Sequence, residues 1–484
     1  MPRPIQPGVI PIQNFNLSGL AFSKWSGRKD SLYKMIGFSP HETPGLLKVA
    51  QKLTKDSSTV VTEFCKVGVN CSNGIRYWFS STSGKVWQEK AGTYTLVYTT
   101  SPAAGTALCS GAAEYQGYLY WATQSRLHRI PIASSQADGA AAWTANAVPN
   151  WAMFSITDAD FHPMWSHTAT LILYIGDGNY VSQVDGSTFS ANALDIKTPL
   201  RIKSLGEIGT DLLIGTYVAD TVNKTEIIRW NTWSVSFTNS DSIDEVGINA
   251  FLPADNFVFV QAGLSGNIYI YDGEKLELYK RIPGDYSPTK YGSVNPYSVG
   301  NLAGQILFGF SNGSGDPADE LVYRIARADR DHPYIMDAPF PISERSGGEF
   351  VLTGVEIGAI LVSGFNVYVA WKNGSSYGID KLDWNTKLSG AYFETRVAVI
   401  NRESFANFAK VVMAYASLPA STSITIQYSK NYAAYVDTTE VDDTDRNIVY
   451  SDIGIEATTI QVKIIVTTSG NNSPELESGG IFLR

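Results

Sequence analysis

Cysteine and long apolar runs are scarce in this chain. Its 484 residues include three cysteines, Cys65, Cys71 and Cys109, an odd number without CxxC spacing. This excludes a disulfide framework and a four-cysteine zinc site, so we interpret the cysteines as small buried residues in a reducing compartment. No run of 18 apolar residues occurs, and we predict no membrane span. No charged head followed by an apolar block marks a secretory signal.

Charged residues and histidines are also few. Asp, Glu, Lys and Arg make up 17% of the chain and apolar residues 44%, a composition that excludes charge-driven disorder. The formal net charge of −9 argues against a protein that grips nucleic-acid backbones. Of the five histidines, His162 and His167 lie five positions apart, which suits neither helical nor strand pairs of metal ligands. We predict that both pack within the fold.

Helical periodicity is almost absent, and short β-branched and aromatic runs bounded by Gly, Asn, Asp and Ser recur instead. Together with 26 Tyr and 21 Phe, this pattern predicts an all-β chain. A unit of one apolar strand, a Gly-rich turn and a second strand starts seven times, at residues 77, 118, 171, 212, 257, 306 and 367. The spacings of 41 to 49 residues between most starts match the ~40–50 residues of a four-stranded propeller blade.

We therefore predict a β-propeller over residues 56–385, with seven blades preferred and six or eight left open. A stack of β-sandwiches is the alternative, because sandwiches also place strands every ~8–12 residues. Residues 1–55 are predicted to be an extended N-terminal arm or a segment that closes the first blade onto the last. Residues 386–484 lack the blade turn and predict a small antiparallel β-sandwich. We expect residues 388–484 to fold as a separate fragment.

One insertion between repeats, residues 316–348, raises a question about assembly. A blade needs only a short corner there, yet the Pro-rich centre of the insertion carries large apolar side chains. They are Tyr334, Ile335, Met336 and Phe340. Because exposed apolar clusters commonly mark interfaces, we predict that these four residues dock on a neighbouring subunit. The alternative is a loop folded back on its own blade.

Motifs of familiar catalytic sets are missing from the sequence. It has no GxSxG elbow, HExxH pair, P-loop or GxGxxG opening a helix, and neither sialidase nor WD40 repeat turns. We predict no enzyme, no cofactor and no metal site. The acidic stretch Asp437, Glu440, Asp442, Asp443 and Asp445 offers oxygen ligands for Ca²⁺ but lacks the EF-hand order, so a solvated loop stays the simpler interpretation.

Tryptophans offer a possible sugar platform, because flat rings stack on pyranose faces. Most of the eleven, however, fall inside the repeats, where packing in the core is the expected role. Examples are Trp78, Trp87, Trp121, Trp230 and Trp371.

The order of the parts and several segments carry a family resemblance. The segments are Glu42-Thr-Pro-Gly-Leu-Leu-Lys-Val, Tyr392-Phe-Glu-Thr, Phe408-Ala-Lys-Val, Ile424-Thr-Ile-Gln-Tyr-Ser-Lys and the ending from Thr467 to Arg484. An N-terminal segment, a degenerate propeller and a terminal sandwich in this order resemble the tail-nozzle proteins of short-tailed bacteriophages. The resemblance covers the whole chain in architecture, and its motifs are loose.

The resemblance implies a structural component of a bacteriophage tail, a nozzle or hub-type protein around the DNA exit path. It implies a ring of copies of the chain, six if nozzle-like, that contacts other tail or head-to-tail proteins in a virion made in the host cytoplasm. A net charge of −9 would repel duplex DNA rather than bind it specifically. A glycan- or receptor-binding propeller at a tail tip is the alternative, followed by a polysaccharide-cleaving enzyme with two placed carboxylates.

Overall fold

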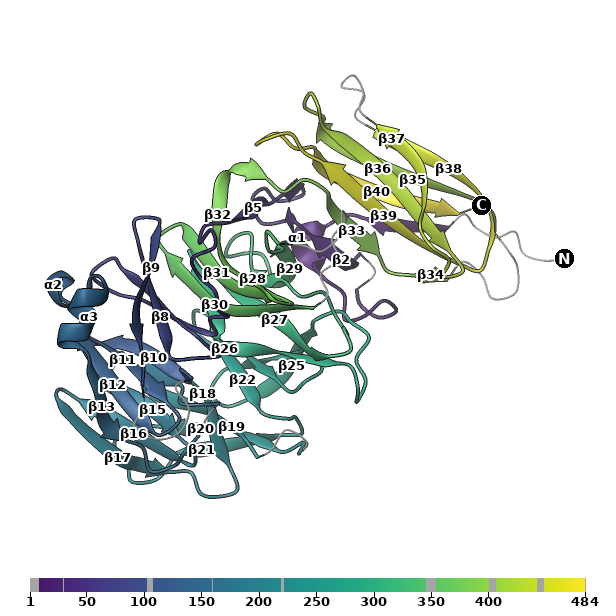
Figure 1. The fold of residues 1–484 in the computed structure, drawn as a ribbon. Coiled ribbons are helices and arrows are strands. Elements are labelled where there is room, and N and C mark those ends of the chain that lie inside the picture. Colours follow the sequence, from purple (N-terminus) through teal and green to yellow (C-terminus); the bar gives the residue numbers. More distant parts are fainter. Residues whose placement is uncertain are drawn as a thin grey trace.

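The fold is a seven-bladed β-propeller with a β-sandwich at one edge (Figure 1). The computed structural model describes residues 8–28, 30–101, 108–158, 160–218, 222–344, 354–399, 406–441 and 448–483. Strand accounts for 58% of the chain and helix for 3%, which confirms the all-β prediction. Among these described residues, no helix has the length and apolar character needed to cross a membrane.

The first three blades follow the chain in order, each with four sequentially paired antiparallel strands. Blade 1 consists of β6 (Val67–Asn70), β7 (Arg76–Phe79), β8 (Lys85–Lys90) and β9 (Thr93–Thr99). Blade 2 consists of β10 (Gly111–Tyr115), β11 (Tyr118–Thr123), β12 (Arg126–Pro131) and β13 (Val148–Met153). Blade 3 consists of β14 (Met164–Ser166), β15 (Leu173–Asp177), β16 (Tyr180–Asp185) and β17 (Thr188–Asp195). Two short helices lie between β12 and β13, α2 (Ser134–Ala137) and α3 (Ala140–Asn146).

The next three blades repeat this arrangement. Blade 4 consists of β18 (Arg201–Ile208), β19 (Asp211–Tyr217), β20 (Thr225–Trp230) and β21 (Asn239–Ile243). Blade 5 consists of β22 (Ile248–Pro253), β23 (Val258–Ala262), β24 (Asn267–Tyr271) and β25 (Leu276–Arg281). Blade 6 consists of β26 (Tyr291–Leu302), β27 (Gln305–Ser314), β28 (Val322–Ala326) and β29 (Ile335–Phe340).

Blade 7 combines strands from two distant parts of the chain. It consists of β30 (Val355–Ser363), β31 (Asn366–Asn373), β32 (Ser376–Lys387) and β5 (Gln51–Lys55). Strand β5 precedes blade 1 and pairs antiparallel with β32, Leu53 lying opposite Leu382. The innermost strands contact one another around the propeller, and β30 contacts β6, so the ring is closed. The seven hairpins recognised in the sequence are the two middle strands of each blade, which confirms the preferred blade count.

The sandwich takes strands from both ends of the chain. One sheet has the order β3 (Phe38–Ser39), β4 (Leu47–Val49), β40 (Glu475–Leu483), β35 (Ala406–Ser417), β38 (Ile448–Ala457), and β1 (Gly8–Ile12) also pairs with β40. The other has the order β2 (Leu32–Ile36), β33 (Ala391–Thr395), β39 (Thr459–Thr467), β36 (Ser423–Lys430), β37 (Val436–Val441), with β34 (Ala398–Val399) on β39. Strand β2 also pairs in parallel with β29, Ile36 lying opposite Ala338. This second sheet therefore continues blade 6.

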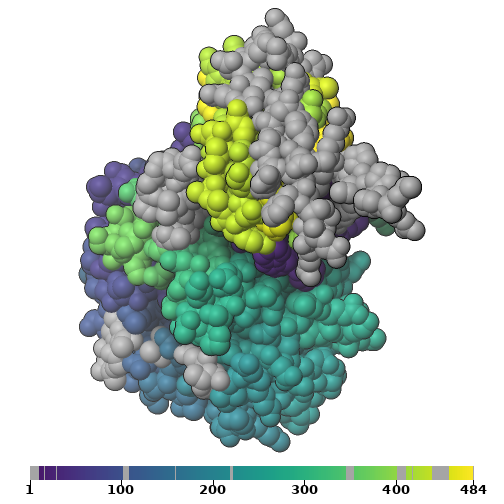
Figure 2. Space-filling model, turned by 90° about the vertical axis from the view of Figure 1, so that its right-hand side faces the viewer, coloured from purple at the N-terminus to yellow at the C-terminus, as the bar shows by residue number. Residues whose placement is uncertain are grey.

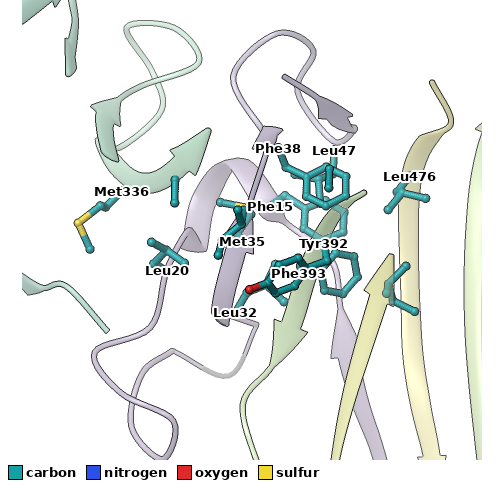
Figure 3. Packing of buried hydrophobic residues seen from close by; sticks show 14 of the residues in the cluster. Phe15, Leu20, Leu32, Met35, Phe38, Leu47, Met336, Tyr392, Phe393 and Leu476 are labelled. Atoms are coloured by element: carbon teal, nitrogen blue, oxygen red, sulfur yellow. The ribbon is translucent and has the colours of Figure 1, made fainter. Parts of the chain in front are cut away.

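One hydrophobic core joins the propeller to the sandwich. Figure 3 shows helix α1 (Phe15–Ser18) and strand β2 between Met336 of blade 6 and Phe393 of the sandwich. The ring of Phe393 lies 6.2 Å from that of Phe15 and 6.1 Å from that of Phe38, and all three side chains are buried. Burying each such side chain contributes roughly 1.5–3 kcal/mol. The side view in Figure 2 shows the yellow C-terminal region resting directly on the propeller.

This seam changes the expected domain organisation. Residues 8–49 contribute β1 to β4 to the sandwich, and β5 then closes blade 7. A fragment of residues 388–484 would lack β1 and β4, which pair with β40, and β2, which pairs with β33. The strand pairing therefore argues against its folding alone. The N-terminal segment is thus a structural part of both units. Its strand β5 completes blade 7, which agrees with the blade-closing alternative and not with the extended arm.

The structure overturns the predicted subunit contact at Tyr334, Ile335, Met336 and Phe340. Strand β29 is the outer strand of blade 6, and Ile335, Met336 and Phe340 are 2%, 0% and 4% exposed within the single chain. The half-buried Tyr334 packs its ring 5.6 Å from those of Phe257 and Phe259. Strand β29 thus docks on the N-terminal segment of its own chain, about 300 residues upstream in sequence, and Tyr334 docks on blade 5. Local patterns do not reveal the first of these pairings.

The smaller packing predictions are confirmed for Cys65, Cys71, His162 and His167, whereas Cys109 is half-buried rather than buried. The cysteines are unpaired, with Cys65 and Cys71 buried. Burial raises the pKa of the Cys109 thiol to about 12, which makes it a poor nucleophile. His162 and His167 are both buried, and His162 stacks on Phe154 with ring centroids 4.0 Å apart.

Candidate functional site

Two cavities of similar size lie near the β26–β27 and β30–β31 turns. The channel cavity, about 260 Å³, lies at the propeller axis between innermost strands β6, β14, β18, β22, β26 and β30. The edge groove, about 250 Å³, lies between blades 6 and 7 and beside the N-terminal segment. The two cavities differ in the side chains that line them, and this difference identifies the candidate site.

Tyr297 from blade 6 lines the channel cavity. Strand β26 shifts its register between Val294 and Val299, so residues 295–298 bulge out of the blade. Pro296 has no N–H to offer the ladder, which makes it suited to such a bulge. The Ser298 hydroxyl donates to the carbonyl of Ile357 at 3.1 Å and also to that of Gly358, which ties the bulge to β30.

The Tyr297 hydroxyl reaches two other blades. It accepts hydrogen bonds from the backbone N–H groups of Ala112 and Met164, both at 3.1 Å. Burial raises the pKa of this phenol above its ordinary value, so it stays neutral. Gly111 is required beside it, because an added Cβ would lie 1.8 Å from the carbonyl oxygen of His162. These contacts tie blades 2, 3 and 6 together at the centre of the propeller.

The floor of the edge groove is a buried network around Arg324 on β28. Its guanidinium donates to Asp337 on β29 at 3.1 Å and 2.5 Å, to the Gln305 side-chain oxygen at 2.8 Å, and to the Ser39 hydroxyl at 2.9 Å. Burial opposes ionisation of Asp337, but the adjacent Arg324 outweighs it and holds the pKa of that carboxyl below its usual value. The network joins blade 6 to the N-terminal segment with its charges balanced.

His41 completes this network as a neutral group. Its ring lies 3.7 Å from the Asp337 carboxylate and is 7% exposed. Burial lowers its pKa, and this outweighs the attraction of Asp337. At neutral pH the site therefore holds one cation and one anion, Arg324 and Asp337.

The rim of the edge groove carries two exposed aromatic side chains, Phe365 and Trp384. Phe365 is 72% exposed and Trp384 is 45% exposed. Strand β32 shifts its register between Asp383 and Lys387, and this bulge carries Trp384. The indole N–H donates to the Phe365 carbonyl at 3.0 Å, so the β32 bulge and the β30–β31 turn are held together.

Polar side chains also line the groove. Glu42 and Gln51 line it, and Lys387 contacts both, at 3.8 Å from the Glu42 carboxylate and 3.2 Å from the Gln51 side-chain oxygen. Among the described lining residues Glu42 is the one carboxylate, whereas glycoside hydrolysis uses two.

Of the predicted interface residues, only Phe340 belongs to this site, as part of the groove wall. Sequence reasoning missed Phe365, Trp384, Arg324 and Gln305. One signal was present for Phe365, which occupies a two-residue turn where small or polar residues are usual. Nothing local marked Arg324 as part of a site, because its partner Ser39 lies 285 residues away in the sequence.

The metal predictions have a limited outcome. Among the described residues, no three His, Cys, Asp or Glu side chains gather in a way that would hold a metal ion. Asp442, Asp443 and Asp445 of the acidic stretch lie outside the described residues.

Comparison with known proteins gives structural likeness only. No known family's sequence model matches the chain, and no curated protein matches it. The extracellular domain of a putative hybrid two component system, BT4673 of B. thetaiotaomicron, aligns with 15% identity and a TM-score of 0.46 over 70% of this chain. The chain spans 41% of that domain's length.

Two smaller propellers align over nearly their whole length. Virginiamycin B lyase from Staphylococcus aureus shows 9% identity and a TM-score of 0.43, covering 68% of this chain and 98% of the lyase. The WD40 repeats of RRP9 show 10% identity and a TM-score of 0.44, covering 68% of this chain and 99% of the repeats. One of these propellers is an enzyme and the other is named for its repeats alone, so the likeness concerns the fold and not the function.

Proposed function

We propose that this protein is a structural subunit of a bacteriophage tail that assembles with copies of itself into a ring of the nozzle or hub type. The observation that carries the proposal is the core shared by propeller, N-terminal segment and sandwich. A chain whose parts are fused in this way loses little internal freedom when it is built into a larger assembly. The order of the parts also matches the resemblance described above.

A structural role is supported by how the chain uses its polar groups. Tyr297 bridges three blades, and Arg324 bridges blade 6 and the N-terminal segment. Each therefore stabilises the relative position of parts that are distant in sequence. We infer from this that the chain acts without a catalytic step, its surfaces being used for contact.

One loop fits a contact between neighbouring copies. The connection between β20 and β21 carries Trp233, 85% exposed, and Val235, 97% exposed. Two large apolar side chains in water on one loop are typical of a surface that a partner covers. We propose that a second copy covers them, so that the contact is head-to-tail and closes into a ring.

Native mass spectrometry of the purified chain over a concentration series tests the proposal. We expect a closed oligomer, with six copies if the assembly is nozzle-like. The double variant Trp233→Ser, Val235→Ser should remain monomeric with an unchanged melting temperature, because neither side chain is packed in the monomer. A wild-type chain that is monomeric at every concentration, or that releases reducing sugar from host capsule, overturns the structural ring.

A further inference from the structure

The turn between β30 and β31 carries a residue that turn chemistry does not explain. Ser363 lies opposite Asn366, so Gly364 and Phe365 form a two-residue hairpin turn. The corresponding two-residue turns elsewhere in the blades hold small or polar pairs. Examples are Gln116-Gly117, Gly209-Thr210, Ala303-Gly304 and Gly374-Ser375. A phenylalanine that is 72% exposed gains nothing from the turn and adds an apolar surface to the groove.

Trp384 adds a second ring at the same rim. Its indole N–H is fixed on the Phe365 carbonyl at 3.0 Å, and the Asp383 carboxylate accepts the Asn385 N–H at 2.9 Å, which orders the bulge. A rigid aromatic side chain of this kind loses little entropy when a ligand stacks on it. The rim is thus a preformed apolar platform.

Planar hydrogen-bonding groups face the same groove. The Gln305 side-chain oxygen accepts from Arg324, which leaves its NH2 group available among the described contacts. Arg324 uses Nε, Nη1 and Nη2 in four contacts and has five N–H donors, so one N–H is uncommitted in those contacts. Gln51 and Glu42 also line the groove and supply further polar groups.

We propose that the edge groove binds a neutral pyranose unit of a polysaccharide or glycan. Its C–H face would stack on Trp384 and Phe365, while adjacent hydroxyl groups would bond to Gln305, Arg324 and the Gln51 side. The charges favour a neutral ligand, because Arg324 is balanced by Asp337 and Lys387 lies 3.8 Å from Glu42. A volume of about 250 Å³ lies just below the ~300–1,000 Å³ of drug-sized pockets, which suits a single sugar ring.

A sugar fits this groove better than a protein segment does. A protein anchor is an apolar side chain inserted into a desolvated pocket, whereas this floor is a polar network and the aromatic groups stand at the rim. This inference is independent of ring assembly, because the proposed subunit contact uses Trp233 and Val235 on blade 4.

The test measures saturation-transfer NMR and titration calorimetry of the full chain with maltohexaose, cellohexaose, mannohexaose and xylohexaose. We expect at least one of these probes to bind, and Trp384→Ala to weaken that binding at least tenfold. Phe365→Asn should weaken it as well while leaving the melting temperature equal or higher, because Asn suits the turn. Trp233→Ala, which removes an exposed tryptophan on another blade, should leave the affinity unchanged.

Three results would overturn the sugar site. The first is that none of the four probes binds. The second is binding that Trp384→Ala and Phe365→Asn leave unchanged, which would place the sugar elsewhere. The third is that the two variants abolish oligomer formation without any sugar binding, which would make the groove a protein contact. Loss of the oligomer in the blade 4 variant alone bears only on the proposed ring.

Discussion

The centre of the propeller and its edge at blades 6 and 7 handle similar cavities in opposite ways. At the centre, a bulge in β26 places Tyr297 in the wall of the cavity, where its hydroxyl accepts hydrogen bonds from two backbone N–H groups of other blades. At the edge, the floor is sealed by the Arg324 network, but Phe365 and Trp384 stay exposed above it. The comparison teaches that size alone does not mark a site. At the centre the aromatic side chain that lines the cavity is buried and hydrogen-bonded to other blades, whereas at the edge two aromatic side chains stay exposed to solvent, where a ligand can reach them.

Breaking the floor of the edge groove should have the largest effect. Arg324→Met leaves the buried Asp337 carboxylate without its cation, and we expect the free energy of unfolding to fall by about 3–5 kcal/mol. Urea denaturation followed by circular dichroism measures this. The matched control is Arg324→Met with Asp337→Leu, which should recover most of the loss because no unpaired charge remains. A double variant as unstable as the single one would show that the charge pair is not the cause.

A substitution in the hydrophobic core that joins the propeller to the sandwich should lower the free energy of unfolding by a similar amount. Phe393→Ala opens a cavity between α1, β2 and the sandwich, where Phe393 is fully buried, and should cost about 3–5 kcal/mol. Because the core is shared, propeller and sandwich should lose structure in one calorimetric transition in both proteins. Two separated transitions in the wild-type chain would contradict a common core.

At the centre, removing one oxygen is sufficient for a test. Tyr297→Phe deletes the acceptor of the Ala112 and Met164 N–H groups and should reduce the free energy of unfolding by about 1–3 kcal/mol. Tyr432→Phe, at a ring that is 57% exposed, should change it by less than ~0.5 kcal/mol. Hydrogen exchange should also become faster at the two freed amides. Unchanged stability would mean that Tyr297 fills space without holding the blades.

A weaker dependence on pH should come from two carboxyls between blades 6 and 7. Glu320 accepts the N–H of Val355, and Asp380 accepts the N–H and hydroxyl of Ser343, both at 2.6 Å. Burial raises the pKa of Glu320 to about 8 and that of Asp380 to about 6. The folded state therefore holds protons that the unfolded state has lost, and stability falls as pH rises from about 4 to about 8.

Melting temperatures measured between pH 5 and pH 8.5 should decrease, and Glu320→Gln should flatten the upper part of the curve. A wild-type melting temperature that rises over this range would contradict the assignment. The protonated Glu320 and Asp380 would then not distinguish the edge from the centre, where Tyr297 does not titrate in this range.

The sequence by itself determined the blades. Each hairpin is local, with an apolar strand, a turn of small residues and a second strand, so Tyr118, Leu212 and Val367 mark their blades without reference to the rest of the chain. Burial of repeated aromatic residues followed from the same pattern, and Trp78, Trp121 and Trp371 are indeed 0% exposed.

Only the tertiary structure decided what lies between and beyond the blades. The apolar run from Ile335 to Phe340 has the same composition whether it contacts a second subunit or its own N-terminal segment. The parallel pairing of Ile36 with Ala338 shows that it contacts the N-terminal segment. The same holds for Arg324, whose partners are 13 residues and 285 residues away. Long-range contacts of this kind depend on where the closed ring of blades places each edge, and no local preference encodes that position.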